Sequence, residues 1–99
     1  MGIPKGWSEK DGALIFAVKC KDFTHALALL NSVGDIAEQL KHHPDLGIRS
    51  YNEVFVTTKT HEANSITSKD YELANRINSL LDYQESKKNT EKYGTDLSS

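Results

Sequence analysis

Cysteine is nearly absent from this 99-residue sequence, which contains only Cys20. A single thiol forms no internal disulfide and no cysteine-based zinc site, so we expect a reducing compartment. Long apolar runs are also missing, and no stretch reaches the length of a transmembrane helix or resembles a signal peptide. We therefore expect a cytoplasmic location, with the nucleus as a further compartment, and no membrane partner.

The sequence has no excess of positive charge. Twelve Lys and Arg residues stand against fourteen Asp and Glu residues, which gives a formal net charge of −2. Direct nucleic-acid binding needs clustered basic residues, and this composition argues against it. A chain of 99 residues forms one domain with a modest core, because short chains bury a smaller fraction of their surface. Self-association would bury more, so we expect a homodimer or homotetramer.

Four segments have the composition of β-strands. The first two, 7–9 and 13–18, flank Asp11-Gly12, the preferred pair of a tight hairpin turn. The other two, 47–51 and 54–59, are rich in β-branched and aromatic residues and are expected to be joined by a two-residue turn. Hairpins make these local pairings antiparallel.

Apolar residues recur at helical spacing between the two predicted hairpins. The helix is expected to begin behind Asp22 as its N-cap and to end at about Lys41 or His42, ahead of Pro44. Its predicted apolar stripe consists of Phe23, Leu27, Leu30, Val33, Ala37 and Leu40, widened by Ala26, Leu29 and Ile36.

A second helix is predicted to begin after Thr67, its expected N-cap. The side chain of Asp70 can accept a hydrogen bond from the Thr67 backbone amide. Ile66 can pack on Tyr71 across this start, and the helix is expected to end near Ser86. Its predicted buried residues are Leu73, Ala74, Ile77, Leu80 and Leu81.

The order strand, strand, helix, strand, strand, helix predicts an α+β fold. We expect two layers, with a four-stranded antiparallel sheet and both helices packed on one face. The domain is expected to span residues 7–86. Residues 1–6 are predicted to be a flexible lead, and the polar residues 87–99 a disordered tail.

Histidines are the side chains best suited to proton transfer near neutral pH. His25 lies in the first turn of the first helix and is predicted to be a surface residue. His42 and His43 follow that helix and His61 ends the last strand, so the sheet can bring these three together. Glu38 precedes His42 by four residues and can orient its ring from the same helix face.

Three convergent histidines have two common uses, a zinc site with an open position and acid–base catalysis on a bound organic molecule. Adjacent histidines rarely share one metal, because the backbone directs their rings apart. A spaced pair such as His-x-His is also missing from the sequence. The pattern therefore favours acid–base chemistry over a metal site.

Four short motifs form a specific combination. They are Glu-Gln-Leu-Lys-His-His-Pro-Asp at 38–45, Tyr-Asn-Glu-Val at 51–54, Thr-Lys-Thr-His-Glu at 58–62 and Ile-Thr-Ser-Lys-Asp at 66–70. Together they resemble the pterin-4a-carbinolamine dehydratase family, and the resemblance covers about residues 6–81.

Three positions depart from the usual pattern of that family. Lys41 stands where an acidic residue is usual, Ser65 stands near a usual glycine, and Ser50 is an extra residue before the Tyr-Asn motif. These differences bear on substrate affinity and subunit contacts more than on the central chemistry.

The resemblance implies dehydration of 4a-hydroxytetrahydrobiopterin to the quinonoid dihydropterin and water, in tetrahydrobiopterin recycling, with no metal and no cofactor. It assigns catalysis to His42, His43 and His61. We expect His43 to hold the pterin and assist proton movement, and His42 and His61 to act as acids on the leaving hydroxyl. The implied substrate-binding residues are Glu38, Lys41, His42, His43, Pro44, Lys59, Thr60, His61 and Glu62.

A non-catalytic role is the alternative that the resemblance offers. Animal members of the family also bind a transcription factor and stabilise its dimer, so the resemblance implies a pterin-binding or transcription-factor-stabilising protein as the alternative. Turnover of a 4a-hydroxypterin distinguishes the enzyme from the binding protein.

Overall fold

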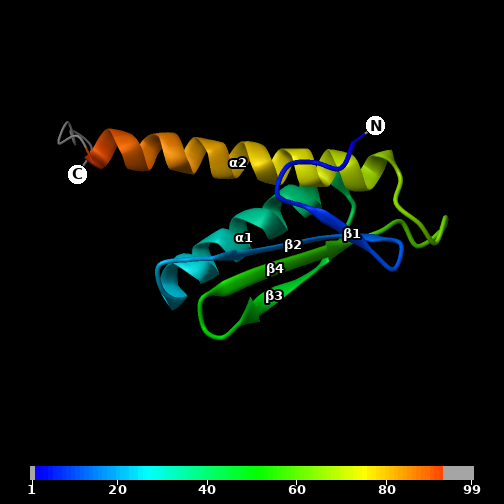
Figure 1. Ribbon diagram of the computed structural model, residues 1–99, viewed down its shortest axis with the longest axis horizontal. Helices are drawn as coiled ribbons and strands as arrows, with labels where there is room; N and C mark the ends of the chain where they lie inside the picture. The colour runs from blue at the N-terminus through cyan, green and yellow to red at the C-terminus, as the bar shows by residue number, and fades with distance from the viewer. Residues whose placement is uncertain (1, 93–99) are drawn as a thin grey trace.

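Four strands form one antiparallel sheet and two helices cover one of its faces in the computed structural model, which describes residues 2–92 (Figure 1). The strands are β1 (Ser8–Lys10), β2 (Ala13–Lys19), β3 (Asp45–Arg49) and β4 (Glu53–Thr58), in the spatial order β1-β2-β4-β3. The helices are α1 (Phe23–Leu40) and α2 (Ser68–Lys92). The predicted two-layer α+β fold is confirmed.

Both hairpins turn through left-handed backbone. Asp11 (φ 55°) and Gly12 (φ 77°) form the predicted tight turn between β1 and β2. The turn between β3 and β4 differs from the prediction, because Ser50 (φ 51°) and Tyr51 (φ 56°) are left-handed and Asn52 completes a three-residue connection. β3 therefore begins and ends two residues earlier than predicted, and it begins directly after Pro44.

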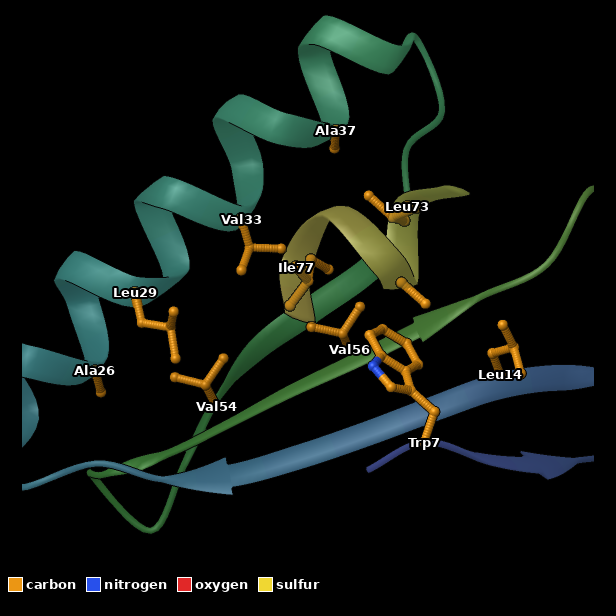
Figure 2. Close-up of a cluster of buried hydrophobic side chains, with 11 residues drawn as sticks. Trp7, Leu14, Ala26, Leu29, Val33, Ala37, Val54, Val56, Leu73 and Ile77 are labelled. Carbon is orange, nitrogen blue, oxygen red and sulfur yellow. The ribbon is translucent and has the colours of Figure 1, made fainter. Parts of the chain in front are cut away.

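The core lies between the sheet and the two helices, as Figure 2 shows. Trp7 closes one side of it, with its ring stacked on Phe16 at a centroid distance of 5.0 Å. The Trp7 Nε1–H group donates a hydrogen bond to Asn78 Oδ1 of α2 at 3.0 Å. The other core residues are Leu14, Ala26, Leu29, Val33, Ala37, Val54, Val56, Leu73, Ala74 and Ile77.

The buried face of α1 differs from the predicted apolar stripe. Phe23 and Leu27, two members of that stripe, are 50% and 41% exposed. The buried residues of α1 are Ala26, Leu29, Val33 and Ala37, so Val33 and Ala37 of the predicted stripe are confirmed, as are two of the residues predicted to widen it. The helix carries two overlapping apolar stripes, and helical spacing alone does not select between them. Packing against the sheet selects the stripe that contains Leu29.

The end of α2 also differs from the expectation. α2 continues to Lys92 instead of ending near Ser86, because extending an existing helix adds one hydrogen bond for each residue ordered. The predicted disordered tail thus overlaps α2 over 87–92, and residues 93–99 lie outside the described chain. In the predicted flexible lead, the Lys5 carbonyl accepts a hydrogen bond from Asn78 Nδ2 at 3.1 Å.

Among residues 2–92, no helix combines the length and the apolar character that crossing a membrane requires.

A pair of leucine substitutions in α1 tests which face is buried. Leu29→Ala should lower the free energy of unfolding by about 2–5 kcal/mol, because it removes a buried side chain and leaves a cavity. Leu27→Ala removes the same atoms from an exposed position, and its effect should stay within about 0.5 kcal/mol. Urea unfolding of both variants measures the difference, and equal losses would contradict the packing of α1.

Candidate active site

The C-terminus of α1 directs His42 and His43 to different partners. Lys41 adopts a left-handed conformation (φ 56°) that turns the chain away from the helix axis. His42 therefore no longer shares a helix face with Glu38, and the predicted contact between these two side chains is wrong. Glu38 Oε2 instead lies 2.8 Å from His43 Nε2, in an exposed pair.

A buried carboxylate, Asp70 of α2, collects four hydrogen bonds. Its Oδ1 lies 2.7 Å from His42 Nε2 and accepts from Thr58 Oγ1 at 2.7 Å. Its Oδ2 accepts from Thr60 Oγ1 at 2.8 Å and from the Thr67 backbone amide at 2.9 Å. The side chain of Asp70 is fully buried, and that of His42 is only 13% exposed.

These contacts fix the charge of Asp70 and the tautomer of His42. Burial raises the pKa of Asp70, but the hydrogen bonds from Thr58, His42, Thr67 and Thr60 together outweigh it, so the pKa lies below its ordinary value. The carboxylate is therefore ionised at neutral pH and can only accept hydrogen bonds. His42 must then carry a proton on Nε2, which it donates to Asp70 Oδ1.

The segments that this carboxylate joins place two further histidines in one cleft. Asp70 bonds His42 after α1 and Thr60 after β4, and the residue that follows each of them is also a histidine. These residues, His43 and His61, line one open cleft of about 430 Å³, within the usual range for small-molecule sites. The cleft is lined by Lys10, Asp11, Ala13, Ile15, His43, Asp45, Thr57, Lys59 and His61.

The residues predicted as a site separate into four groups in the structure. Three of them line the cleft, namely His43, Lys59 and His61. Glu38 and Pro44 line a neighbouring groove between α1 and β3, to which His43 also contributes. His42 and Thr60 belong to the buried Asp70 network, whereas Lys41 and Glu62 are exposed and line neither hollow.

His25 is a surface residue, as predicted. Its side chain is 60% exposed, and its Nδ1 lies 2.6 Å from Asp22 Oδ1 at the start of α1.

The described side chains contain no group of three His, Cys, Asp or Glu residues that could hold a metal ion.

Sequence analysis placed Asp70 in a helix cap and in the motif at 66–70, but it gave the residue no role in the site. That cap is confirmed, since the Thr67 amide donates to Asp70 Oδ2 and the Lys69 amide donates to Thr67 Oγ1 at 3.3 Å. The further contacts of Asp70 with His42 and Thr58 join segments 28 and 12 residues away, and a local cap pattern does not reveal them. There was a weak indication in the sequence that Thr58 is buried, because strand alternation places it on the same face as Val56.

Comparison with known proteins identifies relatives of the whole domain. A family model described as pterin 4 alpha carbinolamine dehydratase matches residues 2–80. A protein of Thermomicrobium roseum is 41% identical over 75 residues, covering 76% of this chain and 80% of its own. One of Sulfurisphaera tokodaii is 44% identical over 77 residues, covering 78% and 82%. Both are named as candidate pterin-4-alpha-carbinolamine dehydratases.

Two solved structures share the fold. The crystal structure of a transcriptional coactivator/pterin dehydratase from Brucella melitensis matches with a TM-score of 0.69 and 35% identity, covering 76% of this chain and 81% of its own. A pterin dehydratase-like protein identified as a RuBisCO assembly factor in the alpha-carboxysome matches with a TM-score of 0.60 and covers 75% and 84%. At 16% identity, this second likeness concerns the fold alone.

Replacement of Asp70 tests the buried network through stability. Because the pKa of Asp70 is lowered in the folded chain, its contribution is present above the unfolded value of about 3.9 and is lost as the pH falls through the folded value. Asp70→Asn should therefore lower the free energy of unfolding at neutral pH by roughly 1–3 kcal/mol. It should also flatten the loss of stability below about pH 4.

Urea unfolding across the acid range measures both effects. Glu72→Gln, which changes an exposed carboxylate of the same helix, is the matched control and should follow the wild-type curve. An Asp70→Asn protein whose stability falls as steeply in acid as that of the wild type would contradict the assigned charge of Asp70.

Proposed function

Because this chain belongs to the pterin-4a-carbinolamine dehydratase family, we propose that it removes water from a 4a-hydroxytetrahydropterin such as 4a-hydroxytetrahydrobiopterin. The product is the quinonoid dihydropterin, and the reaction helps to regenerate the pterin cofactor that aromatic amino-acid hydroxylases use. The observation that carries this proposal is the Asp70 carboxylate, which joins the segments of all three predicted catalytic histidines.

The reaction needs two proton transfers. The hydroxyl on C4a accepts a proton and leaves as water when the C4a–O bond breaks. The proton on N5 is lost as the C4a=N5 bond forms. Imidazole suits both steps, since its ordinary pKa is close to the working pH. The proton released from N5 balances the proton consumed by the hydroxyl, so the enzyme is unchanged after one turnover.

In this proposal, His42 and His61 act as acids from separate elements. Asp70 holds the Nε2–H group of His42, so the proton that His42 donates comes from Nδ1. Because His42 does not line the cleft, the proposal requires the bound pterin to reach this nitrogen at the edge of the cleft. His61 lies in the exposed turn after β4 and lines the cleft directly. A 4a-hydroxyl can be formed on either face of the pterin ring, and two acids on different segments can serve both forms.

His43 is proposed to hold the pterin. It lines the cleft, and its Nε2 lies 2.8 Å from Glu38 Oε2, which restrains the ring and leaves Nδ1 for the substrate. Glu38 thereby acts through His43, as a positioning residue. The apolar and small side chains of Ile15 and Ala13 form part of the same cleft and can support a flat bicyclic ring.

Kinetics of the histidine variants test these roles. His42→Ala and His61→Ala should each lose at most about 10²–10⁴-fold in kcat, because the other acid remains, and the double variant should lose far more than either. His43→Ala should raise the pterin Kd as well as lower kcat. The assay couples dehydration to a phenylalanine hydroxylase, with folding checked by circular dichroism.

His25→Ala is the matched control, since His25 is exposed and lies outside the cleft. It should retain wild-type turnover. An inactive His25→Ala protein beside a normal His43→Ala protein would place the site elsewhere. Wild-type protein that binds pterin without turning it over would exclude catalysis and favour the non-catalytic binding role.

Chelation provides a separate test of the acid–base mechanism. His42 Nε2 and His43 Nε2 are both engaged by carboxylates, and the chain's only thiol is Cys20. Turnover should therefore survive exhaustive treatment with EDTA, and elemental analysis should find no stoichiometric zinc. Loss of turnover that added zinc restores would overturn the mechanism.

A further inference from the structure

Two lysines line the cleft beside the histidines, and the mechanism above uses neither. Lys10 ends β1, and Lys59 directly follows β4. Lys59 Nζ donates a hydrogen bond to Asn64 Oδ1 at 3.3 Å. Among the side chains that the structure describes, neither lysine has a carboxylate partner within 4.0 Å. Two ammonium groups without ion pairs therefore border the cleft.

The register of the sheet sets these lysines on either side of Ala13. Lys10 pairs with Ala13 between β1 and β2. Leu14 pairs with Thr58 between β2 and β4, so one further step along this antiparallel ladder places Lys59 opposite Ala13. Neighbouring strands are about 4.8 Å apart, so the two lysine backbones are about 10 Å apart. Figure 1 shows the β1–β2 turn and the loop after β4 at the same end of the sheet.

This spacing suits one small anion. Ala13 contributes only a methyl group between Lys10 and Lys59, which we call the lysine pair, and lysine stems are long enough for both ammonium groups to reach a single group above it. The cleft also contains two carboxylates. Asp45 pairs with Thr57, two residues before Lys59, and Asp11 lies in the β1–β2 turn next to Lys10, but neither carboxylate forms an ion pair with either lysine among the described side chains.

We propose that the lysine pair binds a negatively charged group on the substituent that the pterin carries at C6. The preferred substrate is then a 4a-hydroxytetrahydropterin with an anionic tail, which refines the substrate class of the function proposed above and rests on it. His61 follows Lys59 by two residues, which span at most about 7 Å of backbone. The reacting ring can therefore contact the histidines while its tail lies over the lysine pair.

Binding of three stable dihydropterins tests this preference by calorimetry. The probes are 7,8-dihydrobiopterin with a neutral tail, 6-hydroxymethyl-7,8-dihydropterin phosphate with a phosphate ester, and 7,8-dihydrofolate with a carboxylate tail. At least one anionic probe should bind about 2- to 30-fold more tightly than dihydrobiopterin, the range that two exposed ion pairs supply. Preference for the phosphate alone places the anion next to C6, and preference for dihydrofolate alone places it farther out.

Substitution of the two lysines tests whether they cause the preference for anionic probes. Lys10→Gln and Lys59→Gln should each lower the ratio of neutral to anionic Kd, and the double variant should bring it close to one. Added salt should lower the same ratio in the wild type. Lys69→Gln, an exposed lysine outside the cleft, is the control and should keep the wild-type ratio.

Two results would overturn the inference. Anionic probes that bind no more tightly than dihydrobiopterin would refute it while leaving the proposed dehydratase function intact. A preference that persists in the double variant would show that other residues select the tail. Failure of all three probes to bind would instead refute the proposed function itself, and with it the inference.

Discussion

The Asp70 carboxylate is the contact on which the candidate site depends. It is fully buried, and its four hydrogen bonds come from the segment after α1, from the end of β4 and beyond, and from the residue before α2. A buried charge is costly unless it is fully bonded, so these three segments can pack together only in an arrangement that satisfies all four bonds. The positions of the histidines follow from that requirement.

Along residues 58–61, side chains alternate between the buried Asp70 network and the open cleft. Thr58 and Thr60 are buried and bond Asp70, whereas Lys59 and His61 line the open cleft. Successive side chains of extended backbone point to opposite faces, so the segment that anchors Asp70 necessarily presents its other residues outward. A one-residue slip in the register of β4 would turn the two threonines outward and Lys59 and His61 inward. It would remove both the hydrogen bonds to Asp70 and the lining of the cleft.

Local sequence patterns predicted much of this structure because their causes are local. The Asp11-Gly12 turn, the Asp22 cap and the Thr67 cap depend on residues within a few positions of one another. The turn at Ser50 and Tyr51 was misplaced because neither residue type favours left-handed backbone. On the predicted buried face of α1, Leu27 was wrongly included because Leu27 and Leu29 are equally apolar, and only contact with the sheet distinguishes them.

The sequence by itself determined the element order, the α+β class and the motifs of the family, because periodicity, caps and short motifs are written in neighbouring residues. Tertiary structure alone decided that His42 pairs with Asp70, that Glu38 pairs with His43, and that His43 and His61 share one cleft. Those contacts join different elements of the fold. They exist only after the left-handed turn at Lys41 and the register of β4 have set the directions of the side chains.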